Sequence, residues 1–302
     1  MLDWRLLLLA LFVGSALYVH YRGQVRHKLT RQLTDHSTFL APINLPLYAF
    51  SAVPNDPYVD RSAFPELDRL KDNWEVIRDE GLALLSNGEI KAAAKHDDAG
   101  FHSFFKTGWK RFYLKWYGDS LPSASETCPQ TVSLLKNIPN VKAAMFTVLP
   151  PDGYLGAHRD PYAGSLRYHL GLLTPNDDQC SITVDGQVHS WRDGEDVVFD
   201  ETFIHHAENR TDKHRLILFC DVERPMSNPL ARAYNRWFSK IFMSAAATQN
   251  REGEKVGFVN RVFGLIYPFR LKMKALKKTN RKLYYAIKYV FFGGLFYFVF
   301  IS

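Results

Sequence analysis

Residues 143–222 limit the possible folds more than any other part of the chain. They form short runs rich in β-branched and aromatic residues, separated by Gly, Pro, Asn and Asp. Such runs are typical of β-strands, and the Asp185-Gly186 pair inside one of them predicts a tight hairpin. The runs are AMFTVL, LRYHLGLL, SITVDGQVHSW, DVVFD and RLILFCDV. Strands at this close spacing predict an antiparallel barrel or a jelly roll, and therefore a mainly β core.

The beginning of the sequence predicts a membrane anchor. Residues 6–19 carry no charge over 14 positions and are followed by a cluster of Arg, His and Lys. This length lies between a signal-peptide core and a short spanning helix. The basic cluster follows the apolar run and no compact small-residue cleavage site is present, which favours an uncleaved anchor. The positive-inside rule then places the chain after about residue 22 in the cytoplasm.

The other end repeats this pattern. Seven Lys and Arg residues between positions 272 and 288 precede residues 289–301, which are uncharged and rich in aromatics. Because a hydrocarbon layer is about 30 Å thick, this segment either spans from near Leu283, with Lys288 reaching the interface, or lies in the interface. The alternative, that both ends are ordinary core helices, is less consistent with segments that are apolar on all faces.

The sequence divides into five predicted parts. Residues 1–22 are the N-terminal membrane anchor, 23–62 a basic juxtamembrane linker, 63–225 the jelly-roll domain, 226–282 a basic amphipathic helical region and 283–302 a C-terminal hydrophobic membrane segment. Prolines within 40–58 predict an irregular connection, and the apolar spacing over 65–87 predicts a helix packed on the domain. The basic helical region either caps the barrel or lies against anionic lipid.

Composition narrows the partners without choosing among them. A chain of 302 residues is long enough for one sizeable core, and its net charge of +7 and pI near 9.2 suggest nucleic acid, an acidic substrate or an anionic bilayer as partner. The three scattered cysteines indicate neither a disulfide framework, nor a zinc site, nor a cysteine nucleophile.

The residues with catalytic potential are concentrated in the β region. His158 and Asp160 stand two apart in GYLGAHRDPYAG, so in extended chain they point to one side. His205 and His206 follow in a later run, and the same alternation lets only one of them face inward. Two histidines and a carboxylate can hold iron with three positions open for a 2-oxo acid and O2. Arg215 is placed to bind the distal carboxylate of such a cosubstrate, and Arg167 and His169 can add hydrogen bonds.

The motifs MFTVLPPDGYLGAHRD, LRYHLGLLTP, DGEDVVFDETFIHHAEN and HRLILFCDVERP resemble the aspartyl/asparaginyl β-hydroxylase family of 2-oxoglutarate-dependent dioxygenases. The resemblance implies a double-stranded β-helix of the jelly-roll or cupin-like type with Fe(II) as cofactor and 2-oxoglutarate and O2 as cosubstrates. It makes His158, Asp160 and His205 the iron ligands, Arg215 the 2-oxoglutarate anchor, and Thr147, Arg167 and His169 cosubstrate-pocket residues. Asp160 departs from the animal members, which have glycine at this position.

Within the family, the chain resembles the bacterial lipid A 2-hydroxylases over most of its length. This resemblance implies lipid A as substrate, hydroxylated at carbon 2 of a secondary acyl chain on the cytoplasmic face of the bacterial inner membrane. An anionic membrane surface is then the expected partner, with no nucleic acid and no obligate protein partner.

Two alternative functions remain open. The substrate could be an Asp or Asn side chain of a protein, or the chain could be a non-catalytic jelly roll that binds a phospholipid or glycolipid.

The role of residues 109–117 also remains open. Aromatic and basic residues interleave there, which fits a phosphorylated headgroup site, a nucleic-acid platform or a plain half-buried strand.

Overall fold

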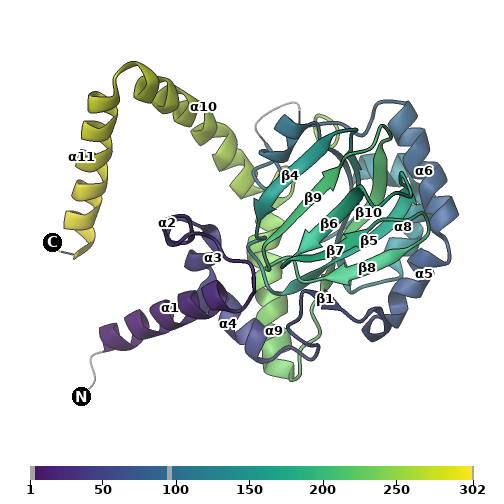
Figure 1. The fold of residues 1–302 in the computed structure, drawn as a ribbon, viewed down its shortest axis with the longest axis horizontal. Helices are drawn as coiled ribbons and strands as arrows, with labels where there is room; N and C mark the ends of the chain where they lie inside the picture. The colour runs from purple at the N-terminus through teal and green to yellow at the C-terminus, as the bar shows by residue number, and fades with distance from the viewer. Residues whose placement is uncertain (1–3, 94–96, 301–302) are drawn as a thin grey trace.

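The structure is a computed structural model that describes residues 4–93 and 97–300. Its centre is a pair of antiparallel sheets (Figure 1). The larger sheet has the strand order β1-β8-β5-β10-β3-β2 and the smaller one β4-β9-β6-β7. The strands are β1 Tyr58–Val59, β2 Lys110–Trp116, β3 Val141–Leu149, β4 Gly153–His158, β5 Ser165–Leu173, β6 Cys180–Val184, β7 Gln187–Ser190, β8 Asp196–Phe199, β9 His205–Asn209 and β10 Arg215–Glu223. The predicted mainly β fold of the jelly-roll or cupin-like type is confirmed.

The predicted strands and the hairpin are present. The five runs supply β3, β5, the β6–β7 pair, β8 and β10. Asp185 and Gly186 connect β6 to β7 with φ angles of 49° and 86°. A two-residue turn with both central residues in the left-handed region matches the right-handed twist of a hairpin, which is why an Asp-Gly pair is suited to it.

A helical layer covers the larger sheet on the side away from the smaller one. It contains α5 (Asp68–Lys71), α6 (Trp74–Ser86) and α8 (Pro129–Lys136), seen at the right of Figure 1. Gly81 allows α6 to approach closely, because a Cβ there would lie 3.2 Å from Phe146 and 3.3 Å from Leu216. The helix predicted over residues 65–87 is therefore present, but it is divided into a 3-10 turn (Pro65–Leu67), α5 and α6.

The predicted juxtamembrane linker, residues 23–62, contains α2 (Leu29–Gln32), α3 (His36–Phe39), α4 (Ala41–Ala49) and the edge strand β1. The irregular connection predicted for residues 40–58 is therefore wrong for α4 and β1, whereas residues 50–57 between them belong to neither a helix nor a strand. Proline near the first turn of α4 removes only an N–H that has no helical partner, so it starts the helix without a penalty. Buried apolar residues of α4 then pack against Tyr162 and Met226, which offsets the cost of Pro46 inside the helix.

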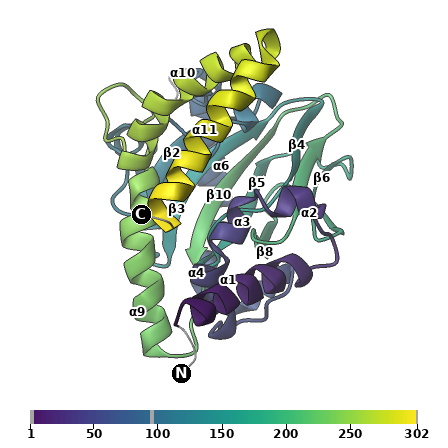
Figure 2. The same ribbon diagram turned by 90° about the vertical axis from the view of Figure 1, so that its left-hand side faces the viewer.

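Both termini extend from one side of the sheets. Figures 1 and 2 show α1 (Trp4–Tyr21) and α11 (Arg281–Phe300) projecting on the left side of the Figure 1 view. Within residues 4–93 and 97–300, α1 alone is long and apolar enough to cross a membrane. The predicted C-terminal segment is helical, whereas residues 1–3 and 301–302 of the two predicted membrane segments lie outside the described residues.

The predicted helical region before α11 is also present. It contains α9 (Pro229–Phe238) and α10 (Phe258–Thr279), joined through a π-helical turn (Ser239–Met243) and a 3-10 turn (Ser244–Ala246). The remaining helical segments are two 3-10 turns (Arg61–Ala63 and Phe104–Thr107) and α7 (Pro122–Thr127).

Candidate metal centre and active-site cavity

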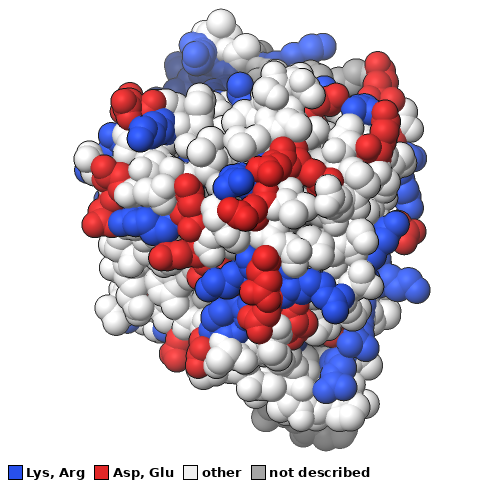
Figure 3. Space-filling model, turned by 90° about the vertical axis from the view of Figure 1, so that its right-hand side faces the viewer, with Lys and Arg blue, Asp and Glu red and all other residues white. Residues whose placement is uncertain are grey.

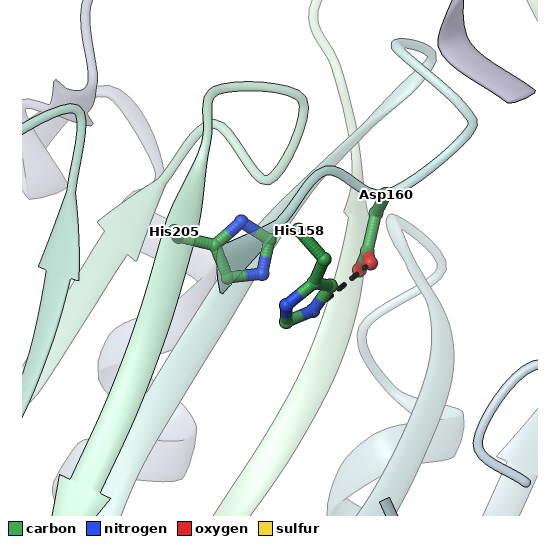
Figure 4. A group of neighbouring side chains, drawn as sticks. All are labelled: His158, Asp160 and His205. Atoms are coloured by element: carbon green, nitrogen blue, oxygen red, sulfur yellow. Dashed lines mark ion pairs between the residues drawn. The ribbon is translucent and has the colours of Figure 1, made fainter. Parts of the chain in front are cut away.

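Two histidines lie side by side at one end of the smaller sheet. His158 ends β4, His205 begins β9, and the two residues face each other in the strand register. Their ring centroids are 4.2 Å apart. Asp160 follows just after β4, and the ligand atoms of the three side chains all lie within 4.8 Å of one another (Figure 4). This set can hold one metal ion.

Backbone carbonyl groups fix the orientation of both imidazoles. Nδ1 of His158 lies 2.7 Å from the Gly156 carbonyl oxygen, and Nδ1 of His205 lies 3.0 Å from that of Phe203. Because a carbonyl oxygen only accepts, each Nδ1 donates and each Nε2 retains its lone pair. Burial lowers the pKa of His158, and burial together with the neighbouring His158 lowers the pKa of His205 to about 3. Both rings are therefore neutral at pH 7 and suited to metal binding.

Arg167 on β5 positions Asp160. Its guanidinium nitrogens lie 2.5 Å from Asp160, 2.8 Å from Glu201 and 2.5 Å from Asp221. The Asp160 backbone N–H also donates to the Glu201 carbonyl, at 2.8 Å. Burial acts to raise the pKa of Asp160, but the charges of Arg167 and of the nearby histidines outweigh it and lower the pKa overall. Asp160 is thus an ionised carboxylate, with one oxygen 3.6 Å from Nε2 of His158.

Three carboxyl groups share this one guanidinium. Burial, reinforced by repulsion from Asp221, raises the pKa of Glu201 well above its ordinary value, and burial likewise raises the pKa of Asp221. Ser165 donates to Glu201 at 2.8 Å and the Tyr117 hydroxyl donates to Asp221 at 2.9 Å. The donors of Arg167 are therefore engaged by the protein, and its place in the cavity is that of a positioning residue for Asp160.

A second group of buried polar atoms lacks partners within the protein. Arg215, the first residue of β10, is 2% exposed and pairs with no carboxylate among residues 4–93 and 97–300. Its guanidinium lies 4.2 Å from the Trp191 ring, and burial lowers its pKa to about 10. Oγ1 of Thr147 and both ring nitrogens of His169 also find no hydrogen-bond partner in the described part of the chain. Such groups are costly to bury unless a ligand satisfies them, and together they match a carboxylate.

One cavity joins the two groups. It comprises about 460 Å³ of atom-free space and reaches from the His158–Asp160–His205 cluster to Arg215. Its remaining wall is mostly apolar and includes Phe101, Phe104, Trp109, Leu155 and Phe219. The Phe104 ring lies 4.8 Å from the ring of His158. The cavity thus has an ionic end, a metal-binding centre and an apolar wall.

The segment that follows α1 supports both histidine-bearing loops from outside. Arg22 donates to Asp200 at 2.7 Å and to Thr202 at 2.5 Å, shortly before His205. Near His158, Arg31 donates to the Ala157 carbonyl at 2.7 Å. The segment that directly follows α1 is therefore in contact with the residues next to both candidate histidine ligands.

The structure places all seven predicted site residues around this cavity: Thr147, His158, Asp160, Arg167, His169, His205 and Arg215. As the strand alternation predicts, only one of the two adjacent histidines lines the cavity; it is His205, the one that the family resemblance implies, and not the half-buried His206. The donors of Arg167 contact protein carboxylates, which gives it a role in positioning Asp160, and its expected contact with a cosubstrate stays a prediction. The sequence reasoning missed the role of Asp221, although an acidic residue within the apolar run RLILFCDV signals a buried partner.

Residues 109–117, in which aromatic and basic residues interleave, form a half-buried strand in the structure. They contain the whole of β2, in which Phe112, Tyr113 and Leu114 are buried. Arg111 is also buried and contacts Asp98 at 3.0 Å. Lys110 is exposed, and Lys115, Trp116 and Tyr117 are half-buried. The structure therefore supports the alternative of a half-buried strand, and a headgroup or nucleic-acid platform formed by its exposed residues stays untested.

Comparison with known proteins identifies the family. The model of the family described as aspartyl/asparaginyl beta-hydroxylase matches residues 71–225. This chain belongs to that family. It is 34% identical over 225 residues to an ornithine lipid ester-linked acyl 2-hydroxylase of Rhizobium tropici, covering 67% of this chain and 80% of the relative. It is 29% identical over 168 residues to the human aspartyl/asparaginyl beta-hydroxylase, covering 54% of this chain but only 22% of the human protein.

The family membership makes the protein a hydroxylase of the 2-oxoglutarate-dependent dioxygenase class. The predicted enzyme class is confirmed. Among solved structures, a Pseudomonas putida prolyl-4-hydroxylase aligns with 51% of this chain and 87% of its own, at 18% identity and a TM-score of 0.36.

Proposed function

We propose that this family member uses Fe(II), 2-oxoglutarate and O2 to hydroxylate carbon 2 of an ester-linked fatty acyl chain of a membrane lipid. The observation that carries the proposal is the single cavity in which a neutral two-histidine, one-carboxylate set lies near an unpaired buried guanidinium. Two imidazoles and a carboxylate on one side of an ion are the donor set of non-haem Fe(II) oxygenases. A buried cation without a counterion fits the free carboxylate of a 2-oxo diacid.

The bound iron would supply oxygen activation, in which oxidation of 2-oxoglutarate to succinate and CO2 accompanies insertion of one oxygen atom into a C–H bond. The side chains have separate tasks around it. His158, Asp160 and His205 would hold the metal, and Arg167 would keep Asp160 ionised and oriented. Arg215, Thr147 and His169 would bind the distal carboxylate, and the aromatic wall would exclude water from the acyl chain.

Two features favour a lipid over a protein side chain as substrate. The wall that faces the metal centre is aromatic and aliphatic, which suits an acyl chain better than a polar Asp or Asn side chain. The segment after α1, a helix with the properties of a membrane anchor, contacts the loops that carry the candidate ligands. The enzyme would therefore work at the membrane surface, with α1 in a bacterial inner membrane and the catalytic domain in the cytoplasm.

Two lipids are the candidate substrates. Resemblance to the lipid A 2-hydroxylases favours a secondary acyl chain of lipid A, which by definition is esterified to the hydroxyl of another acyl chain. The rhizobial relative is named for an ester-linked acyl chain of an ornithine lipid. Both substrates present an ester-linked chain whose carbon 2 could reach the metal, so the proposed chemistry is the same and only the headgroup differs.

Mass spectrometry of total lipids tests this function. Lipid A and ornithine lipid would be compared between cells with and without the protein, in a host that makes both. We expect one added oxygen on an ester-linked acyl chain, lost in His158→Ala and retained in His206→Ala, a neighbour that does not line the cavity. Fragmentation would assign the oxygen to carbon 2. Unchanged masses of all lipids in cells with folded, membrane-bound protein would refute the proposal and direct attention to Asp and Asn residues of proteins.

A further inference from the structure

Residues 101–106 form part of the wall of the metal cavity and also line a second cavity. Phe101 and Phe104 line the metal cavity. Their neighbours His102, Ser103 and Lys106 line a different cavity on the other side of the same segment. This single stretch of chain therefore separates the two cavities, so a ligand in one lies close to the other.

The second cavity, here called the basic cleft, lies between this segment, α10 and the first turn of α11. It comprises about 1180 Å³ of atom-free space, far more than the metal cavity. Its charged side chains are Lys106, Arg270, Lys274 and Lys277, and none of its lining residues is acidic within the part of the chain that the structure describes. Phe263, Tyr267 and Tyr284 form the aromatic part of its wall.

The cations of the basic cleft lack counterions. Among residues 4–93 and 97–300, no ion pair involves Lys106, Arg270 or Lys274, whereas Lys277 lies over the Tyr284 ring at 5.5 Å. Like charges brought together in a concave site repel one another and attract an anion. A doubly charged phosphate group with several acceptor oxygens satisfies such a set best.

The basic cleft belongs to the most positive part of the chain. Residues 258–300 contain no Asp or Glu, and their basic residues are Arg261, Arg270, Lys272, Lys274, Lys277, Lys278, Arg281, Lys282 and Lys288. Since the whole chain has a net charge of +7, the remainder is not basic overall. The opposite face shows Lys and Arg interspersed with Asp and Glu (Figure 3). The positive charge is thus concentrated beside the active site.

Helix α10 also indicates where the anion comes from. At about 100° per residue, Phe263, Tyr267, Arg270, Lys274 and Lys277 lie on the face of the helix toward the basic cleft, while Phe258, Leu265 and Phe269 lie on the opposite face. Those three apolar side chains are 63% to 79% exposed. Arg261 and Lys272 also lie on that face, and their long side chains can reach the headgroups while the apolar side chains enter the lipid. Such a helix is suited to a membrane interface, which brings the basic cleft to the level of lipid headgroups.

We propose that the basic cleft binds a phosphate group on the headgroup of the lipid whose acyl chain enters the metal cavity. The inference rests on the proposed acyl hydroxylase function and specifies its substrate class. It favours a phosphorylated lipid such as lipid A over an ornithine lipid, whose amino-acid headgroup carries no phosphate.

The test is a kinetic comparison with purified full-length protein in detergent micelles. Lipid A with its phosphates, the same lipid A after enzymatic removal of the phosphates, and ornithine lipid would each be supplied with Fe(II), 2-oxoglutarate and O2. The cleft variant combines Arg270→Gln with Lys274→Gln. The matched control combines Lys272→Gln with Lys278→Gln, which removes the same charge from the same helix outside the basic cleft. Thermal unfolding of each protein would check folding.

We expect the cleft variant to raise KM for phosphorylated lipid A about tenfold or more, because each lost charge-assisted hydrogen bond weakens binding by about that factor. Removal of the phosphates should raise the wild-type KM similarly, and the cleft variant should not raise it further. Equal KM values for the two lipid A forms, a lower KM for ornithine lipid, or equal effects of both variant pairs would overturn the cleft assignment while hydroxylation persists. If the wild type hydroxylates no lipid, the proposed function fails as well.

Discussion

Replacing Arg215 with Met is expected to stabilise the ligand-free protein and abolish its response to 2-oxoglutarate. The guanidinium is 2% exposed and has no carboxylate partner in the described residues. Because its pKa is lower in the folded protein than in the unfolded chain, its positive charge opposes folding at neutral pH. An unbranched apolar side chain of similar length would fill the same space without that cost.

The magnitude follows from the pKa. Burial lowers the pKa of Arg215 from 12.5 to about 10. At about 1.4 kcal/mol per pKa unit, the charge costs on the order of 3 kcal/mol. The substitution also removes the contact with the Trp191 ring, worth about 1 to 2 kcal/mol. A net gain of about 1 to 2 kcal/mol remains, equivalent to a rise of several degrees in melting temperature.

Thermal unfolding with and without ligand is the assay, with Mn(II) in place of Fe(II) to prevent turnover. Saturation with 2-oxoglutarate at about a hundred times its Kd stabilises a protein by about 2.7 kcal/mol. The wild type should gain this and the Met variant should not, so the order of melting temperatures reverses on addition of the ligand. Arg215→Lys is the control that keeps a charge but loses the bidentate geometry. A Met variant less stable than the wild type without ligand would show that Arg215 is held by protein contacts, and the reasoning would fail.

Three further outcomes test the metal centre and its frame. Asp160→Ala should lower Co(II) affinity about tenfold or more in a spectroscopic titration. Unchanged affinity would show that His158 and His205 bind the metal without a carboxylate ligand. Arg22→Ala should reduce the free energy of unfolding, measured by urea denaturation, by about 3 kcal/mol, because the buried carboxylate of Asp200 loses one of its cationic partners. A loss below about 1 kcal/mol would show that this ion pair does not stabilise the fold. Since burial lowers the pKa of His158 and lowers that of His205 to about 3, protons compete with the metal at lower pH than for ordinary imidazoles, so Co(II) affinity should change little from about pH 8 to pH 6.5. A fall beginning near pH 7, as for ordinary imidazoles, would contradict the effect of burial on these rings.

The strands and the histidines could be predicted because their signals are local. Alternation along a strand and a two-residue turn depend on neighbouring residues, so the β6–β7 hairpin follows from the sequence, as does the fact that only one of His205 and His206 faces inward. Helix α4 could not be predicted in the same way. The prolines of residues 40–58 favour irregular chain locally, and only packing of α4 against Tyr162 and Met226, far along the chain, stabilises the helix.

The sequence by itself determined the β core, the apolar and basic ends, and the set of side chains from which the candidate metal centre is built. Tertiary structure decided how those side chains are paired. Asp160, Glu201 and Asp221 come from three separate segments, and only the folded sheets bring them onto Arg167 and leave Arg215 without a counterion among the residues that the structure describes. The physical reason is that charge pairing in a buried site depends on distance and desolvation, which are set by contacts between residues far apart in the sequence.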